Sequence, residues 1–359
     1  IKTLKTYEKQ SAVENRTQLF IETPYRNVQL FEDMIATLSP TTRLTIACDI
    51  TTENEYIKTM LIKDWKHVNP DINKRPTIRI ICPIILNLIL VMKTYKRVLS
   101  IAGSDSGGGA GVQADLKAIS ACGCFAMTAI TAVTAQNTLG VRAIEPLPVN
   151  VIDAQIRACL DDIGVDAIKI GMLHSVEVIQ TVTRVLADYP IKYIVVDPVM
   201  VATSGDLLVQ QEAIAVMQKE LFPLATVITP NLYEIEILSG KKIRSQEDLY
   251  LSIPALKSIG ARNILLKAGH LECEEITDVL IDCEHDLEYR YPAKKIITPN
   301  THGTGCSLSS SVASYLAHDF PLNIAVEKAL NYLHGAIETA AGYQIGHGHG
   351  AIHHFYKWW

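Results

Sequence analysis

The segment NTHGTGCSLSSSVASYLA, residues 300–317, combines glycine and small polar residues in an order that could bind an anion. Gly303, Thr304, Gly305 and Cys306 lead into a run that favours a helix, so several backbone N–H groups are expected to point at one place. The helix dipole adds to the attraction for negative charge. A phosphoryl group in transfer needs such preorganised donors. The alternative is a glycine-capped turn in front of a packed helix.

Three shorter motifs could supply charge beside this anion hole: DPVM (197–200), TPNLYE (229–234) and LKAGH (266–270). Asp197 and Glu234 each follow a strand-like run, where carboxylates could hold Mg2+ directly or through water. Lys267 could neutralise the phosphates of a nucleotide. Carboxylates at strand ends also cap the following helix, and a lone lysine is commonly solvated, so the prediction depends on the combination.

A glycine-rich turn, IAGSDSGGGAGVQADLKA, occupies residues 101–118. Its glycines allow a tight turn and a close approach to a ligand, and a helix is predicted over residues 113–120. The turn lacks the GK[ST] ending of a Walker A loop and does not match G-x-G-x-x-G in register. It therefore predicts neither P-loop nor Rossmann chemistry, and such a turn is as often purely structural.

Short apolar runs alternate with amphipathic helical segments through the C-terminal part of the chain and predict the elements that position these motifs. The predicted strands are residues 97–103, 126–135, 166–173, 193–199, 225–230, 263–269 and 278–282. Repeated strand–helix units predict a mainly parallel sheet covered by helices on both faces. Ligands then bind at the carboxyl ends of the strands, where each motif lies.

Together these motifs resemble the bacterial hydroxymethylpyrimidine and hydroxymethylpyrimidine-phosphate kinase family. IAGSDSGGGAGVQADLK, TAVTAQNTLGV, KIGML, VDPVM, TPNLYE, LLKAGH, NTHGTGCSLS and the terminal GHGHGAIHHFYKWW occur in the family's order over residues 93–359. The resemblance implies an α/β, ribokinase-like three-layer fold, usually a homodimer. It also implies ATP and Mg2+ dependence, with phosphorylation of 4-amino-5-hydroxymethyl-2-methylpyrimidine to its monophosphate and then to the diphosphate, for thiamine biosynthesis.

The resemblance also assigns site residues. The pyrimidine pocket is expected to include the residues Gly103, Asp115, Gln136 and Met172. ATP and Mg2+ are expected to meet Asp197, Asn231, Glu234, Lys267 and the hole formed by Gly303, Thr304 and Gly305. Gln136 can both donate and accept hydrogen bonds at the edge of an aminopyrimidine. We expect this amide to let the enzyme distinguish the aminopyrimidine from a pyridoxal ring.

Cys306 stands where sugar kinases of the wider superfamily place a catalytic aspartate. A helix N-terminus favours the thiolate, so we expect Cys306 to accept the hydroxyl proton. The alternative is a compact residue that only lines the hole.

Two other functions compete with this one. A pyridoxal kinase would use the same fold and the same GTGC hole, although Gln136 argues against pyridoxal as the main substrate. A noncatalytic pyrimidine-binding regulator would be expected to have a broken anion hole or to lack Lys267, and the sequence keeps both.

Residues 1–91 differ from the rest of the chain and predict a β-α-β-α order: an extended piece at 18–26, a helix at 27–38, a strand at 42–50 and an amphipathic helix at 52–68. IETPYRN, ACDIT and KRPTI resemble the C-terminal portion of tetrapyrrole-methylase-type, rRNA ribose methyltransferases. We interpret residues 1–79 as a truncated, nonfunctional remnant and residues 80–92 as an apolar linker. A genuine accessory domain is the alternative, and an rRNA-binding or methylating fusion would depend on this segment alone.

Composition limits the partners. The 359 residues carry a formal net charge of -5, which gives no global basic field for nucleic acid or an anionic membrane. The eight cysteines show no C-x-x-C pairing, so neither a zinc site nor a disulfide framework is expected, and a reducing cytoplasm fits best. The most apolar run, residues 80–92, falls short of the roughly 20 residues needed to span a bilayer.

Overall fold

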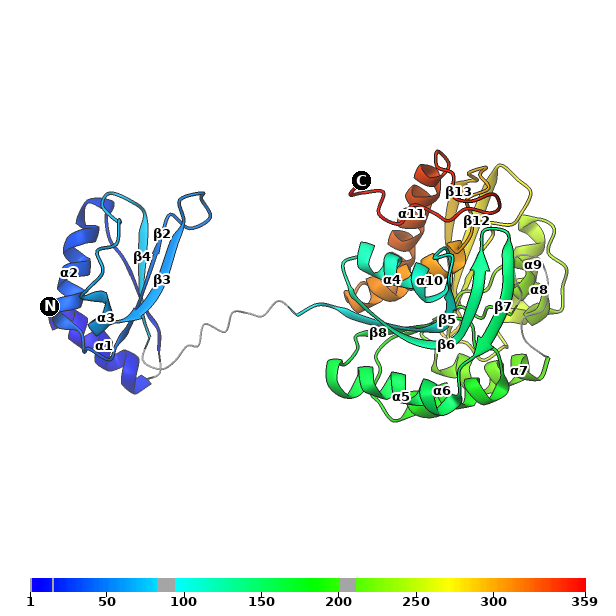
Figure 1. Cartoon of the computed structure of the whole chain (residues 1–359), viewed down its shortest axis with the longest axis horizontal. Coiled ribbons are helices and arrows are strands. Elements are labelled where there is room, and N and C mark those ends of the chain that lie inside the picture. Colours follow the sequence, from blue (N-terminus) through cyan, green and yellow to red (C-terminus); the bar gives the residue numbers. More distant parts are fainter. Residues whose placement is uncertain (1, 15, 83–93, 201–210) are drawn as a thin grey trace. The chain divides into compact units, whose positions relative to one another are not determined.

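The computed structural model describes residues 2–14, 16–82, 94–200 and 211–359 (Figure 1). The chain forms two compact units, Ile1–Thr94 and Tyr95–Trp359, which are described separately. None of the described helices combines the length and apolar character that a membrane crossing requires.

The N-terminal unit contains an antiparallel sheet in the order β1-β4-β2-β3. Its elements are α1 (Lys2–Glu14), β1 (Gln18–Ile21), η1 (Pro24–Arg26), α2 (Asn27–Thr37), β2 (Arg43–Cys48), β3 (Tyr56–Leu61), α3 (Ile62–Trp65) and β4 (Thr77–Cys82). Met34, Leu44 and Ile46 are fully buried, and the indole of Trp65 donates a hydrogen bond to Leu44 O at 2.8 Å. This unit therefore has an apolar core of its own.

The predicted helix over residues 52–68 is wrong. Tyr56–Leu61 is a strand that pairs with β2 as a hairpin, and only Ile62–Trp65 is helical. The hairpin turn contains Asp49 and Thr51 at positive φ, and the strand that follows is rich in β-branched and aromatic residues. In addition, β4 includes residues 80–82, which were assigned to the linker, and residues 83–92 of that linker lie outside the described residues.

The C-terminal unit is a three-layer α/β/α structure around one mixed sheet, as predicted. The sheet order is β13-β12-β11-β10-β9-β8-β5-β6-β7. The six neighbouring strands β11, β10, β9, β8, β5 and β6 are parallel to one another. The strands at the two ends of the sheet, β12 and β13 on one side and β7 on the other, pair antiparallel with their neighbours. The strands are β5 (Arg97–Asp105), β6 (Phe125–Asn137), β7 (Gly140–Pro146), β8 (Ala167–Ile170), β9 (Ile194–Val196), β10 (Val227–Ile228), β11 (Asn263–Leu266), β12 (Glu275–Asp282) and β13 (Leu287–Lys294).

Alternation of apolar side chains along the central strands builds the two interfaces with the helices. In β5, Leu99 and Ile101 pack in one core cluster, while Val98 packs in the other. The first face is covered by α5 (Val149–Ala158), η2 (Cys159–Ile163), α6 (Val176–Ala187), α7 (Gln211–Val216), η3 (Met217–Leu221), η4 (Phe222–Leu224), α8 (Leu232–Ser239) and α9 (Gln246–Leu256). The second face is covered by α4 (Gly111–Ala121), α10 (Thr304–Ala317) and α11 (Leu322–Ala340) (Figure 1).

The loops that follow β5, β9, β10 and β11 carry the glycine-rich turn and the DPVM, TPNLYE and LKAGH motifs. Because these strands are parallel, their carboxyl ends lie at the same edge of the sheet, where a ligand is expected to bind. The edge strands β7 and β13 were not among the predicted strands.

Candidate active site

Two glycine-containing loops, about 190 residues apart in sequence, interlock at this edge. Gly303 has φ 78°, and a Cβ there would stand 1.8 Å from Gly109 O. A Cβ on Gly109 would in turn stand 2.3 Å from Cδ2 of His302. Glycine is therefore required at position 303, where a side chain would force the loops apart, whereas a side chain at position 109 would displace the His302 ring. The contact joins the end of β5 to the start of α10.

The N-terminus of α10 has no side-chain cap. Gly303 is the N-cap residue and offers no side-chain acceptor to the first N–H groups of the helix. Thr304 and Gly305 form the first turn, and a Cβ on Gly305 would stand 3.4 Å from both Oδ2 of Asp197 and Nζ of Lys267. The predicted anion hole and the predicted charged residues are thus brought together.

Lys267 and Asp197 form an ion pair at the ends of β11 and β9. Nζ of Lys267 lies 2.8 Å from Oδ1 of Asp197, which also accepts a hydrogen bond from the Thr229 hydroxyl at 3.2 Å. Burial alone would lower the pKa of Lys267, but the charges of Asp197 and Glu234 raise it. Lys267 therefore stays cationic and can face phosphate groups.

Glu234 and Asn231 close a capping box at the start of α8. The Asn231 side chain accepts from Glu234 N at 3.1 Å, and the Glu234 carboxylate accepts from Asn231 N at 2.8 Å and from Met200 N at 3.0 Å. Burial raises the pKa of Glu234 to about 7, a rise that Lys267 opposes and Asp197 supports. The capping role that we weighed as the alternative is therefore present. The parts of the chain that the structure describes contain no cluster of three metal-ligating side chains.

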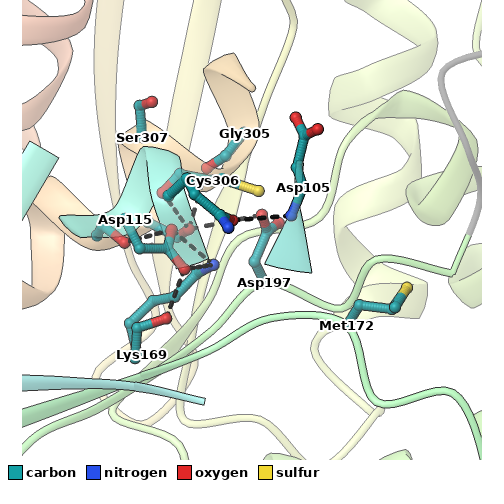
Figure 2. Close-up of polar contacts among 12 residues, drawn as sticks. Asp105, Asp115, Lys169, Met172, Asp197, Gly305, Cys306 and Ser307 are labelled. Carbon is teal, nitrogen blue, oxygen red and sulfur yellow. Dashed lines mark hydrogen bonds and ion pairs between the residues drawn. The ribbon is translucent and has the colours of Figure 1, made fainter. Parts of the chain in front are cut away.

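Asp115 is completely buried rather than open to a substrate. Its carboxylate is paired with Lys169 Nζ at 2.9 and 2.8 Å, and it accepts hydrogen bonds from the hydroxyls of Ser100 at 2.5 Å and Ser310 at 2.7 Å. Figure 2 shows this pair with Cys306 and Asp197 close by. Both carboxylate oxygens are engaged by the protein, so the geometry favours a positioning role over the direct contact with substrate that we expected.

Gly103 and Met172 lie against each other at the ends of β5 and β8. A Cβ on Gly103 would stand 2.7 Å from Cε of Met172, and the Met172 carbonyl accepts a hydrogen bond from Thr131 at 2.9 Å. Gln136, near the end of the neighbouring β6, is held through its main chain: the Ser106 hydroxyl donates to Gln136 O at 2.7 Å and accepts from Gln136 N at 2.8 Å. The proposed pyrimidine residues thus come from adjacent strands.

Cys306 is placed in the first turn of α10, but its thiol is not activated in this structure. Burial raises its pKa to about 11, although Lys169 and a hydrogen bond from Gly111 N favour the thiolate. Asp115 and Asp197 oppose ionisation. The thiolate that we expected at the helix N-terminus is therefore not supported, because desolvation by burial outweighs the contributions of Lys169 and Gly111 N.

Sequence reasoning missed Asp105, His302 and Lys169. Asp105 accepts hydrogen bonds from the N–H groups of Gly107, Gly109 and Ala110 at 2.8 to 3.0 Å and so shapes the glycine-rich turn. An aspartate in front of three glycines is a signal for such a turn. A lysine in the fully apolar run of β8 is a signal for a buried partner.

Comparison with known proteins decides the family. Residues 105–353 match the family model described as phosphomethylpyrimidine kinase. The hydroxymethylpyrimidine/phosphomethylpyrimidine kinase of Rhizobium meliloti is 48% identical over 262 residues, which are 73% of this chain and 97% of that protein. The chain belongs to the phosphomethylpyrimidine kinase family.

Solved structures agree with membership of the phosphomethylpyrimidine kinase family. The phosphomethylpyrimidine kinase of Clostridium difficile is 42% identical with a TM-score of 0.59, covering 67% of this chain and 99% of that chain. An ADP complex of Bacillus subtilis pyridoxal kinase is 34% identical with a TM-score of 0.67, covering 72% and 97%. The predicted ribokinase-like fold is confirmed. The family model matches only residues of the C-terminal unit, so the methyltransferase resemblance of residues 1–79 is not supported and stays a prediction.

Proposed function

We propose that this kinase transfers the γ-phosphoryl group of ATP to the 5-hydroxymethyl group of 4-amino-5-hydroxymethyl-2-methylpyrimidine, and then to the monophosphate so formed. One observation carries the proposal: the N-terminus of α10, which no side chain caps, lies against the ion pair of Lys267 and Asp197, since the Cβ position of Gly305 is 3.4 Å from Oδ2 of Asp197 and from Nζ of Lys267. Backbone donors and a buried cation at one place suit a group whose negative charge is spread over several oxygens.

The anion hole would bind the group in transfer, and Lys267 would neutralise charge on the nucleotide phosphates. An ADP complex of a pyridoxal kinase with the same fold supports ATP as the phosphoryl donor here. Asn231 caps α8 at the same edge of the sheet and would border the nucleotide. These groups would position the reactants and stabilise the negative charge of the transition state, which is most of what phosphoryl transfer requires from a protein.

Mg2+ is part of the proposal. In kinases this ion keeps several waters and is held by one or two carboxylates together with substrate phosphates. Asp197 and Glu234 fit such a site, because both are buried at the same edge and their charges interact. Each Glu234 oxygen accepts one backbone hydrogen bond and keeps a lone pair that can meet a metal-bound water. When bound, the ion would neutralise charge on the phosphates.

The pyrimidine would lie beside Gly103, Met172 and Gln136, with the Gln136 amide at its amino edge. Asp115 would not contact the substrate. It would position Lys169 through their ion pair and α10 through its hydrogen bond with Ser310. Cys306 would stand next to the acceptor hydroxyl. Only the thiolate can accept the hydroxyl proton, so Cys306 would first have to lose its own proton to solvent, and Lys169 and the hydrogen bond from Gly111 N favour that form.

The test is a coupled assay of ADP release with hydroxymethylpyrimidine, its monophosphate and pyridoxal as separate acceptors. We expect the first two to be preferred. Preference for pyridoxal would favour the pyridoxal kinase that the 34% identical structure represents. Binding of hydroxymethylpyrimidine without any ADP release would favour a noncatalytic regulator.

The proposal also covers the oligomeric state of the protein and its location in the cell. We propose a homodimer in the cytoplasm without nucleic acid or membrane partners, and a segment 1–79 without a catalytic role. A mass measured by light scattering would test the dimer.

A further inference from the structure

A repeated motif near the C-terminus, GHGHG at residues 346–350, has no part in the chemistry described above. A Cβ on Gly346 would stand 2.3 Å from Oγ1 of Thr138, and one on Gly348 would stand 2.0 Å from Thr138 O. A Cβ on Gly350 would stand 1.9 Å from Oδ1 of Asn300. The three glycines therefore let the main chain lie directly on two other parts of the molecule, where a side chain would force a displacement. We call residues 346–350 the C-terminal strap.

The C-terminal strap joins the hairpin of β6 and β7 to the loop in front of α10. The N–H of His349 donates to Thr138 O at 2.9 Å. Thr138 lies in the turn between β6 and β7, two residues beyond Gln136. The N–H of His302, which immediately precedes the N-cap residue of α10, donates to Gly350 O at 3.0 Å. One short segment thus contacts both the hairpin that carries Gln136 and the loop that begins the anion hole.

Buried residues anchor the chain directly after the C-terminal strap. Ile352 and His354 are each 4% exposed. Nε2 of His354 lies 2.9 Å from the hydroxyl of Ser307 in α10, and the His354 carbonyl accepts the hydroxyl of Tyr332 in α11 at 3.0 Å. By contrast, β7 on the far side of the hairpin turn is exposed along its whole length. The strap is therefore fixed by two helices and can in turn hold the hairpin.

We propose that the C-terminal strap is a positioning element for the phosphoryl acceptor, which holds the hairpin turn beyond Gln136 at a set place relative to the start of α10. This inference rests on the proposed function, in which Gln136 meets the acceptor and the start of α10 meets the group in transfer. Transfer needs the two reactants in near-attack geometry, and a misplacement of about 1 Å can lower the rate about a hundredfold. The strap contacts the hairpin and not Lys267, so its effect is on the acceptor rather than on ATP.

Gly346→Ala tests this role, because its Cβ would meet Oγ1, Cγ2 and Cβ of Thr138 at 2.3, 2.9 and 3.1 Å. We expect G346A to raise the KM for hydroxymethylpyrimidine about tenfold, while the KM for ATP stays within about twofold. Thr138→Gly removes all three of these atoms, so the double variant should come within about threefold of T138G alone. Gly342→Ala is the matched control and should leave both KM values unchanged, since the nearest atom to its Cβ position is Thr339 O at 3.8 Å.

The rescue separates contact with the hairpin from backbone strain. Gly346 has φ 67°, and T138G cannot relieve the strain of an alanine there, so a loss caused by strain alone would persist in the double variant. His349→Pro is a second variant, which removes the N–H bonded to Thr138 O without placing an atom on Thr138, and it should raise the same KM. Its result decides the matter if G346A does not fold.

Three outcomes would overturn the role of the C-terminal strap: a normal KM for hydroxymethylpyrimidine in folded G346A and in H349P, an equal rise in the KM for ATP, or no recovery in the double variant. A wild-type enzyme that phosphorylates pyridoxal but not hydroxymethylpyrimidine would instead overturn the proposed function, and that result appears before any variant is made.

Discussion

The ammonium of Lys169 lies 2.9 and 2.8 Å from the two carboxylate oxygens of Asp115, and neither side chain reaches solvent. Burial alone would lower the pKa of Lys169, but the Asp115 charge overrides it and raises the pKa. The pair connects β8 to α4, and Ser310 adds α10 through its bond to Asp115. It therefore ties α4 and α10 to the central sheet.

Replacement of Lys169 by methionine should destabilise the protein by about 3–5 kcal/mol, because it leaves the Asp115 charge buried without a partner. Unfolding in urea, with the midpoint and slope of the C-terminal unit fitted separately, would measure the change. Lys257→Met is the matched control, since Lys257 pairs with Asp286 at the surface and its loss should cost at most about 1 kcal/mol. Equal effects of the two substitutions would contradict the role given to the buried pair.

Gly303→Ala should lower kcat about a hundredfold or more. A Cβ at this position would stand 1.8 Å from Gly109 O, so the first turn of α10 must move away from Lys267 and Asp197. Gly240→Ala is the control, because Gly240 also has a positive φ of 68° but no atom within 4 Å of its Cβ position. That change should leave kcat unaltered and cost roughly 1–2 kcal/mol of stability. Steady-state kinetics on both variants would show whether the loss of kcat comes from the clash with Gly109 or from backbone strain at a positive φ.

The sequence predicts the central strands and the edge of the sheet that holds the site, because each motif directly follows a short apolar run. It does not predict β7, whose side chains are exposed along its whole length and so carry no apolar signal. The strand predicted over residues 42–50 matches β2, but β3 was mistaken for part of a helix over residues 52–68 because the charged residues around it hide its alternation. Residue composition is a weak predictor of whether a half-exposed segment forms a strand or a helix.

Some features of the site could be predicted from the sequence, and others depend on tertiary structure. The approach of Gly303 to Gly109 depends on tertiary structure, and no local pattern specifies that residues about 190 positions apart will touch. The capping box of Asn231 and Glu234 could have been recognised, since N-x-x-E before an apolar run is its local signature. We read Glu234 mainly for its charge and gave helix capping only as the alternative.

Gln136→Met should reduce the ratio of kcat/KM for hydroxymethylpyrimidine over pyridoxal, because an amide that pairs with the aminopyrimidine edge contributes about 1–3 kcal/mol. Gln136 is positioned for this by the double contact of its main chain with Ser106, which the substitution leaves in place. Rates with each acceptor at saturating ATP give the ratio. A ratio equal to that of the wild type would remove Gln136 from substrate selection.

Cys306→Ala should lower kcat roughly a hundredfold while KM changes little, if the Cys306 thiolate accepts the hydroxyl proton in the transition state. Near-normal kcat would leave Cys306 as a residue that lines the anion hole.

The raised pKa of Cys306 gives an independent measurement on the ligand-free enzyme. With a pKa of about 11, the thiolate fraction is small at pH 7.5, so alkylation by iodoacetamide should be slow and should accelerate as the pH rises towards that value. Cys273 is exposed and serves as the internal reference in peptide mass spectrometry. Alkylation of Cys306 as fast as that of Cys273 at pH 7.5 would contradict the assigned shift.

A chain that begins at Met92 should keep the full kcat/KM of the kinase. The family match covers residues 105–353, the first strand of the C-terminal unit starts at Arg97, and all the proposed site residues lie beyond it. A truncated remnant would be loosely ordered and cut first by protease, but Leu44, Ile46 and Trp65 form a buried core that argues against loose order in residues 1–91.

The core of the N-terminal unit changes what proteolysis should show. We now expect cleavage to yield two resistant fragments rather than loss of the N-terminal piece, because each unit buries its own apolar side chains. The thermal midpoint of the kinase unit should be the same in the full chain and in the chain that starts at Met92. A lower midpoint or a large loss of kcat/KM in the shorter chain would mean that residues 1–91 support the kinase, and the genuine accessory domain would then replace the remnant as the better interpretation.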